Sequence, residues 1–278
     1  MRAVNFYQLN TVTNTNTTPS SANALYTDLS GYYDLMCSDI NYQAQSQHVQ
    51  RLHQFFGNGG KQHLDLACGT GPHVRYFIDN GYQSSGLDIN QPMLDIAQQR
   101  CPEAYFMLGD MTKFSLSEPV DIISCFLYSL HYCADLAKLQ DCFASVHRAL
   151  KLDGIFCFNA VNKDLIDNKV FERHTAEQDN SHFVFTSAWH YPGTGDKQSL
   201  LLSIEKTSSL NNQETNQQAP QQTSQTWQDH HPMVALNFEQ LRQLLSPYFE
   251  VQMFEHDYDK IIPWNQTSGN AIFVCVKK

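Results

Sequence analysis

The stretch LDLACGTG, residues 64–71, decides the fold of this 278-residue chain. It reads as an apolar strand that ends in a glycine-rich turn and leads into a helix. Gly69 and Gly71 allow a tight turn and a close approach of the backbone to a ligand, because neither carries a Cβ atom. A dinucleotide fingerprint would need a third glycine at position 74, where this chain has Val74. The departure favours an adenosine ligand without a pyrophosphate.

Strands and helices alternate on both sides of this turn. We expect strands at 63–67, 83–88, 104–108, 120–125 and 155–159, and helices at 42–56, 72–80, from 91 onward and at 135–150. Asn90 is the expected N-cap of the third helix, with Pro92 in its first turn. Strands separated by helices pair in parallel through right-handed crossovers. The pattern predicts a doubly wound α/β sheet that binds ligands beyond the carboxyl ends of its strands.

After about residue 170 the pattern changes to strands without helices between them. Segments 182–190 and 200–208 are rich in β-forming residues and flank a Pro/Gly turn. The Gln/Asn-rich segment 211–226 is expected to be a long exposed loop, followed by a third strand around 226–235. A helix at 238–245 and strands near 250–256 and 271–276 then complete the core. The expected organisation is a flexible leader and N-terminal lid (1–41, polar over 1–24), a cofactor-binding core (42–168), an antiparallel β insertion covering the acceptor site (169–235), and the C-terminal part of the core (236–278).

Acidic residues follow two further strands. Asp88 ends the second strand, nineteen residues after Gly69, where a carboxylate can accept hydrogen bonds from both ribose hydroxyls. Gly109-Asp110-Met111 follows the third strand. The Asp110 carboxylate could accept a hydrogen bond from an adenine amine while Met111 packs against the ring. Three such signals together are far more specific than one glycine turn.

Composition narrows the class of partner and the compartment. Lys+Arg is 18 and Asp+Glu is 28, a net charge of −10, and no basic cluster is present, which argues against a nucleic-acid partner. The eight cysteines form no Cys-x-x-Cys pair and several lie in apolar runs, as expected for buried free thiols in a reducing compartment. Without a signal-peptide pattern or a long apolar run, we expect a cytoplasmic protein with no membrane contact. Whether it forms a homodimer is left open.

The motifs LDLACGTG, GLDIN-QPML, LGDM and the turn LKLDG (150–154) resemble those of class I S-adenosylmethionine (SAM) methyltransferases over about residues 25–165. The segments YYDL (32–35) and SCFLYSLHYC (124–133) are similar to a small-molecule group within that family. This group includes sugar-amine N,N-dimethyltransferases and glycine/sarcosine N-methyltransferases. The resemblance implies a seven-stranded, mostly parallel sheet with an antiparallel last strand.

The resemblance also implies roles for individual residues. Ala67, Gly69 and Gly71 would line the methionine part of SAM, with Asp88 at the ribose and Asp110–Met111 at the adenine. Tyr33 would close over the cofactor. Where the group often has Asp after the fifth strand, this chain has Asn159, which puts a carboxylate role there in doubt. The other expected cofactor-site residues are Asp65, Cys68, Ile89, Met93, Gly109 and Phe126.

Candidate catalytic residues follow the fourth strand. His131, and beside it Tyr128, could take a proton from an acceptor amine or orient the acceptor. The pair His230-His231 could approach the pocket from the insertion, but a solvated pair is the expectation. His256, Asp257 and Asp259 lack the spacing of metal ligands, so no metal is expected. Cys68 is expected to pack against the cofactor, because methyl transfer needs no nucleophilic thiol.

The expected activity is SAM-dependent methyl transfer to a small polar acceptor, most readily an amine nitrogen, with S-adenosylhomocysteine as the product. Three alternatives remain open. One is an O-methyltransferase acting on a small hydroxyl or carboxylate acceptor. A second is a SAM-binding protein without catalysis. A third, an NAD-linked oxidoreductase, is disfavoured by Val74.

Overall fold

The computed structural model describes residues 24–27, 29–209 and 222–278. Most of the expected leader (1–24), and residues 211–221 of the expected Gln/Asn-rich loop, lie outside these ranges. The N-terminal part holds two short 3₁₀ turns and a one-turn helix: η2 (Ala24–Tyr26), η3 (Ser30–Tyr32) and α1 (Tyr33–Met36). The core then runs α2 (Tyr42–Phe56), β1 (Gln62–Leu66), α3 (Pro72–Asp79), β2 (Gln83–Asp88), α4 (Gln91–Arg100), β3 (Tyr105–Leu108), β4 (Val120–Cys125), η4 (Ser129–Tyr132), α5 (Leu136–Ala149) and β5 (Leu150–Val161). It is completed by α6 (Phe238–Leu245), β10 (Phe249–Glu255) and β11 (Asn270–Lys277).

The core is one seven-stranded sheet in the order β10-β11-β5-β4-β1-β2-β3. Neighbours from β5 to β3 pair in parallel, whereas β11 is antiparallel to both β5 and β10. The predicted seven-stranded sheet with an antiparallel last strand is therefore confirmed. The order reverses between β1 and β4, which is where ligands of doubly wound sheets bind.

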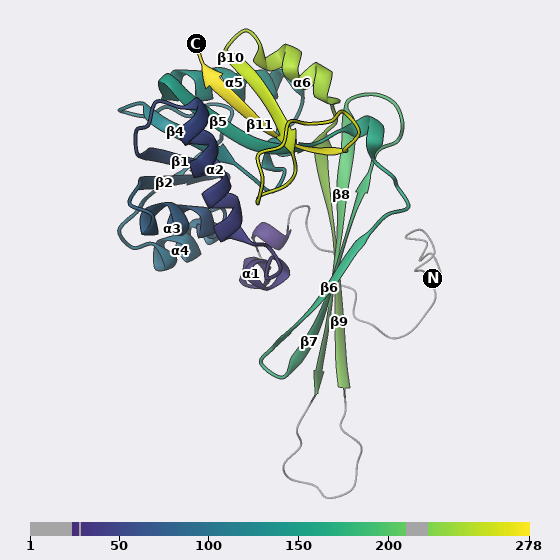
Figure 1. Ribbon diagram of the computed structural model, residues 1–278. Helices are drawn as coiled ribbons and strands as arrows, with labels where there is room; N and C mark the ends of the chain where they lie inside the picture. Colours follow the sequence, from purple (N-terminus) through teal and green to yellow (C-terminus); the bar gives the residue numbers. More distant parts are fainter. Residues whose placement is uncertain (1–23, 28, 210–221) are drawn as a thin grey trace, which may run out of the picture.

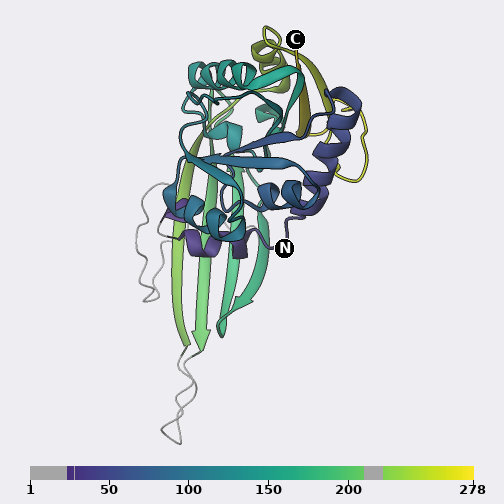
Figure 2. The ribbon, with the colours of Figure 1, turned by 90° about the vertical axis from the view of Figure 1, so that its left-hand side faces the viewer.

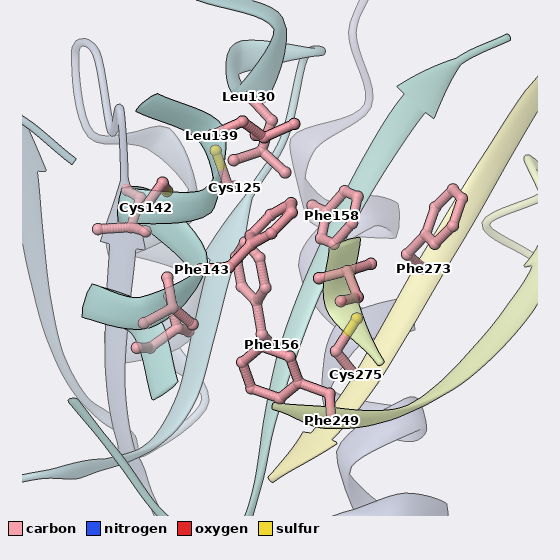
Figure 3. Close-up of a cluster of buried hydrophobic side chains, with 14 of the residues drawn as sticks. Cys125, Leu130, Leu139, Cys142, Phe143, Phe156, Phe158, Phe249, Phe273 and Cys275 are labelled. Carbon is pink, nitrogen blue, oxygen red and sulfur yellow. The ribbon is translucent and has the colours of Figure 1, made fainter. Parts of the chain in front are cut away.

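Alternation along β5 sorts its side chains between the two faces of this sheet. Phe156 and Phe158 point toward α5 and α6, where they pack with Phe143 in a buried cluster (Figure 3). Ile155 and Cys157 point to the other face, where α2 and α3 lie. Helices thus cover both faces of the sheet, and its two cores leave the carboxyl edges of the strands free to build a site.

The insertion is a separate antiparallel sheet of four strands: β6 (Glu172–Gln178), β7 (Ser181–His190), β8 (Lys197–Ser209) and β9 (Gln222–Val234). The predicted antiparallel insertion is confirmed, but two details were wrong. β6 was not expected, because its sequence ERHTAEQ is almost wholly polar. Residues 222–226 continue β9 rather than the loop, since β8 and β9 pair in register as far as Ser209 and Gln222.

The N-terminal segment lies between the two sheets. Leu25 packs with Phe183 and Leu202 of the insertion, and the aromatic rings of Tyr26 and Tyr33 border the same cluster. Figures 1 and 2 show these short helices against the long ribbon of β6–β9, which extends well beyond the core. The N-terminal segment therefore joins insertion and core on the carboxyl side of the main sheet.

All eight cysteines are buried and unpaired, as predicted. Among the described helices, none is long and apolar enough to cross a membrane. Asn90 stands at the N-cap of α4, but its side chain makes no cap hydrogen bond. Its amide Nδ2 lies instead 3.3 Å from Oδ1 of Asp88.

Candidate active site

The turn after β1 has a left-handed backbone at three positions. Ala67 and Gly69 have φ of 53°, and Gly71 has φ of 80°. A Cβ atom on Gly71 would lie 3.1 Å from Cβ of Ala97, so this glycine allows α3 and α4 to pack closely. Gly69 faces a cavity, where its missing side chain leaves space beside Tyr33 and Met93. Ala67 adopts a left-handed backbone although it is not glycine, and such strained conformations are common at binding sites.

Asp88 ties this turn to the end of β2. Its carboxylate is 6% exposed and accepts hydrogen bonds from the backbone N–H of Gly69, at 2.9 Å, and of Asn90, at 2.8 Å. Burial raises the pKa of Asp88 above its ordinary value, while these hydrogen bonds oppose that rise. Oδ1 also lies 3.3 Å from Nδ2 of Asn90, whereas Oδ2 has the Gly69 N–H as its donor and keeps an acceptor position for a hydroxyl group.

The strand ends enclose a cavity of about 520 Å³, within the usual size range of small-molecule sites. Ten of the fifteen site residues predicted from the sequence line it: Tyr33, Ala67, Gly69, Asp88, Ile89, Met93, Gly109, Asp110, Met111 and Tyr128. The insertion, which the sequence led us to expect over the site, contributes Ser187, Trp189, Leu200 and Leu202 to the wall. Sequence reasoning did not name these four residues. The cavity therefore lies between the core, the N-terminal segment and the second sheet.

Four predicted residues stand behind this cavity rather than in its wall. Asp65, Cys68 and Phe126 line a much smaller adjoining space, and Gly71 serves helix packing. Asp65 Oδ1 accepts a hydrogen bond from the Ser124 hydroxyl, a contact that links β1 to β4 beneath the turn. These four residues therefore support the turn after β1 without lining the cavity itself.

The turn after β4 also has a left-handed backbone, with φ of 53° at Leu127 and 62° at Tyr128. Asn159 holds it, since its Oδ1 accepts from the Tyr128 backbone N–H at 3.0 Å. The residue that departs from the family pattern is thus a support for the cavity wall. Burial raises the pKa of the Tyr128 phenol to about 12, which keeps it neutral. Tyr128 can therefore orient a ligand but does not serve as an ionised base at neutral pH.

His131 does not reach the cavity, contrary to the prediction. Its Nδ1 lies 2.9 Å from the Val234 carbonyl oxygen, and its Nε2 accepts from the Val161 backbone N–H at 3.1 Å. The ring is 1% exposed, and burial lowers its pKa to about 4. Because both nitrogens have backbone partners, His131 joins β5, η4 and β9 and is not placed to take a proton from a ligand.

The expectation of a solvated pair was correct for His230 and wrong for His231. Successive residues of a strand point to opposite faces, so His230 is exposed while His231 is fully buried. His231 Nδ1 meets the hydroxyl of Tyr132, a residue of the cavity wall. Both histidines lie within the strand expected around 226–235, so the period of two of a strand could have predicted this.

Three polar residues, Asp34, Thr70 and Arg100, connect α1 to the glycine turn and are called the clasp here. The Thr70 hydroxyl donates to Asp34 at 2.6 Å, and Arg100 contacts both the Asp34 carboxylate, at 2.5 Å, and the Thr70 carbonyl, at 2.7 Å. Tyr33, next to Asp34, is thereby held over Gly69. The YYDL segment contains Asp34, but the partners of Asp34, Thr70 and Arg100, lie 36 and 66 residues away in the sequence.

Within the described ranges, no three His, Cys, Asp or Glu side chains group as metal ligands. His256, one of the residues considered for such a role, lies instead near Asn159, at 3.3 Å from Nδ2, and 2.9 Å from the Tyr258 hydroxyl.

Residues 64–154 match the family model described as a methyltransferase domain. The chain has a class I methyltransferase core. This domain holds the glycine turn, Asp88, Asp110 and Tyr128, so the match covers most of the core side of the cavity. The resemblance found in the sequence is thereby confirmed.

Two curated relatives match parts of the methyltransferase core. The dTDP-3-amino-3,6-dideoxy-alpha-D-glucopyranose N,N-dimethyltransferase of Streptomyces fradiae is 39% identical over 77 residues, which cover 28% of this chain and 30% of that protein. The malonyl-[acyl-carrier protein] O-methyltransferase of Serratia marcescens is 29% identical over 102 residues, 37% of this chain and 39% of the relative. The first three curated relatives are matched over 56%, 37% and 30% of their own lengths, so none is matched over two thirds.

The similarity in fold extends further than the similarity in sequence. The structure of Streptomyces venezuelae DesVI superposes with a TM-score of 0.75 at 18% identity, covering 91% of this chain and 99% of that one. The methyltransferase core and the β insertion therefore form a fold that a solved structure shares over nearly its whole length.

Proposed function

We propose that this protein transfers a methyl group from SAM to an amine nitrogen of a small polar acceptor, such as an amino sugar. The observation that carries the proposal is the cavity itself. It brings the glycine turn, Asp88 and Asp110 together at the switch point of a methyltransferase core. The amino-sugar methyltransferase among the relatives supports the choice of an amine, and the O-methyltransferase is the reason for testing hydroxyl and carboxylate acceptors as well.

The residues present fit SAM. Gly69 places no side chain in the cavity beside Tyr33 and Met93, and Oδ2 of Asp88 offers an acceptor position for a ribose hydroxyl. Asp110 has one carboxylate oxygen bonded to the Thr112 N–H at 2.8 Å. Met111 and Ile89 add apolar surface for an adenine ring. When bound, SAM supplies a methyl group made electrophilic by its sulfonium.

The protein's own contribution is binding, orientation and exclusion of water. Tyr33 and Tyr26 of the N-terminal segment, with Trp189 of the insertion, cover the cavity opposite the core. Aligning an acceptor lone pair with the methyl group within a closed site supplies much of the rate enhancement for such displacements. The acceptor must also be uncharged at the reacting nitrogen, because an ammonium has no lone pair.

A small acceptor rather than a polymer fits the charge of the chain. The net charge is −10, and the described cavity wall has one basic side chain, Lys138, beside the carboxylates Asp88 and Asp110. Nucleic-acid binding draws on many Lys and Arg contacts to successive phosphates, and the described wall offers one such side chain.

The test is transfer of labelled methyl from SAM to a panel of acceptors. The panel contains dTDP-3-amino-3,6-dideoxy-α-D-glucopyranose, glucosamine, their hydroxyl analogues and small carboxylates. We expect saturable labelling of amines only. Labelling confined to hydroxyls or carboxylates would replace the proposal with O-methylation, and SAM binding without labelling of any acceptor would reduce the protein to a binding module.

A further inference from the structure

A chain of four polar side chains runs from the cavity wall into the buried interior of the insertion. The hydroxyls of Tyr26 and Tyr132 lie 2.7 Å apart, and the Tyr132 hydroxyl meets Nδ1 of His231. Nε2 of His231 lies 2.9 Å from Oδ2 of Asp229. Tyr26 and Tyr132 line the cavity, while His231 is fully buried. Three separate segments, η2, η4 and β9, contribute to this chain.

The order of the partners favours one placement of the protons. Asp229 makes an ion-pair contact with Nε2 rather than a hydrogen bond, and a carboxylate at that distance favours the proton on that nitrogen, which leaves the Nδ1 of His231 as an acceptor. The Tyr132 hydroxyl must then donate to Nδ1, and its oxygen accepts from the Tyr26 hydroxyl. The Tyr26 oxygen is left with free acceptor capacity at the cavity wall. Every proton in the chain is thus directed away from the cavity and toward Asp229.

The carboxylate at the end is well supported. Asp229 accepts at Oδ2 from the Leu25 backbone N–H and at Oδ1 from the His230 backbone N–H, both at 3.0 Å. Such bonds favour the ionised carboxylate. An ionised partner stabilises the imidazolium that forms when His231 takes up a proton.

We propose that Tyr26, Tyr132, His231 and Asp229 form a relay that removes a proton from the acceptor's ammonium group. This inference rests on the proposed function. The N–H bond of the ammonium breaks and its proton goes to the Tyr26 oxygen, the Tyr26 proton passes to Tyr132, and the Tyr132 proton passes to His231 Nδ1. The electron pair stays on nitrogen as the lone pair that attacks the methyl group. After the product leaves, the extra proton on His231 returns through Tyr132 and Tyr26 to the cavity and passes to solvent there.

The surroundings allow proton transfer without a charged tyrosine. Burial raises the pKa of both Tyr26 and Tyr132 above the ordinary value, so each remains a neutral hydroxyl that passes a proton on. Cys37, which faces them from the end of α1, also stays neutral, because burial raises its pKa to about 11. Asp88 acts on Tyr26 from β2 as a further negative charge.

The strand paired with this part of β9 carries no titratable group at the matching positions. Leu200 stands opposite His231, and Leu202 stands opposite Asp229. The charged group nearest to His231 along the relay is therefore the carboxylate of Asp229.

The test compares initial rates at pH 6.5 and pH 9.5 with dTDP-3-amino-3,6-dideoxy-α-D-glucopyranose and saturating SAM. For His231→Asn and Tyr26→Phe we expect a loss of about tenfold or more at pH 6.5 and a loss below about threefold at pH 9.5. The reason is that an amine with a pKa near 8 is mostly ammonium at the lower pH and mostly free base at the higher. A merely structural defect would lower both rates alike.

Matched controls lie next to both residues. His230→Asn changes an exposed histidine of the same strand, and Tyr32→Phe removes a hydroxyl from the same N-terminal segment outside the cavity. Both should keep the wild-type ratio of rates at the two pH values. Variants of His231 and Tyr26 whose ratio also stays unchanged would overturn the relay while leaving the proposed function intact.

A second measurement needs no turnover. The ¹⁵N shifts of the His231 ring at neutral pH should show a proton on Nε2 and none on Nδ1. A proton on Nδ1 would overturn the relay whatever the activity. A wild-type protein that methylates no amine would overturn the proposed function itself and the relay with it.

Discussion

At the scale of single residues, the site depends on side chains whose partners are backbone groups of neighbouring turns. Asp88 accepts from Gly69 N–H, Asn159 accepts from Tyr128 N–H, and His131 contacts two strands. The role of Asp88 could be predicted from the sequence, because a residue at the carboxyl end of a strand in this fold lies at the ligand-binding edge of the sheet. The role of His131 could not, because its partners Val161 and Val234 lie 30 and 103 residues away.

His131→Gln tests the structural role of this histidine. Because burial lowers its pKa to about 4, the unfolded chain binds a proton between about pH 6.5 and pH 4 that the folded protein does not. The free energy of unfolding therefore falls as pH falls through that window, by up to about 3 kcal/mol from this group. The variant should show a shallower fall in urea titrations at pH 7 and pH 4.5.

The exposed His230→Gln is the control and should keep the wild-type slope. The methylation rate of His131→Gln at pH 7.5 should lie within about threefold of the wild-type rate. A loss of 10² or more in kcat, with SAM binding unchanged, would restore His131 as a catalytic base.

At the scale of elements, the sequence predicted the core well and the insertion only in part. Apolar strands such as 120–125 and the helix 238–245 were placed correctly, because buried faces impose periodicity. β6 escaped prediction because it is an edge strand with little to bury. The start of β9 was missed because its Gln-rich sequence gains strand structure from pairing with β8, which local sequence does not reveal.

Arg100→Gln tests the clasp between α1 and the glycine turn. The ion pair of Arg100 with Asp34 is partly exposed, so its loss should be modest, and we expect the SAM dissociation constant to rise about threefold to tenfold. Arg75→Gln is the control, since it breaks a comparable ion pair with Glu103 away from the cavity. Calorimetry should detect an effect in Arg100→Gln alone. An equal effect in both variants would mean that the clasp does not position the lid.

At the scale of the whole molecule, the two sheets and the N-terminal segment lie next to one another (Figure 1), and residues from all three line one cavity. The core side carries the residues expected to hold SAM, and the insertion supplies much of the opposite wall. The sequence led us to expect the insertion over the site, but no local pattern could reveal that Trp189 and Leu200 line the cavity, because their place depends on how the second sheet packs against the N-terminal segment.

Trp189→Ala tests this division between the two walls. Removing the indole enlarges the acceptor side, so we expect the KM for the acceptor to rise about tenfold while the SAM dissociation constant stays within about twofold. Trp227→Ala, on the same sheet but outside the cavity wall, should leave the acceptor KM nearly unchanged. If SAM binding weakened and the acceptor KM did not change, the assignment of the two walls would be reversed.

The most direct measurement is calorimetric titration of the protein with SAM, S-adenosylhomocysteine and NAD. We predict one site for SAM and its product and no detectable binding of NAD. Asp88→Ala should weaken SAM binding by about 1–3 kcal/mol, because the ribose hydroxyls lose their acceptor, and Asp95→Ala, an exposed carboxylate of α4, should not. Binding of NAD without SAM, or an unchanged SAM affinity in Asp88→Ala, would contradict the account.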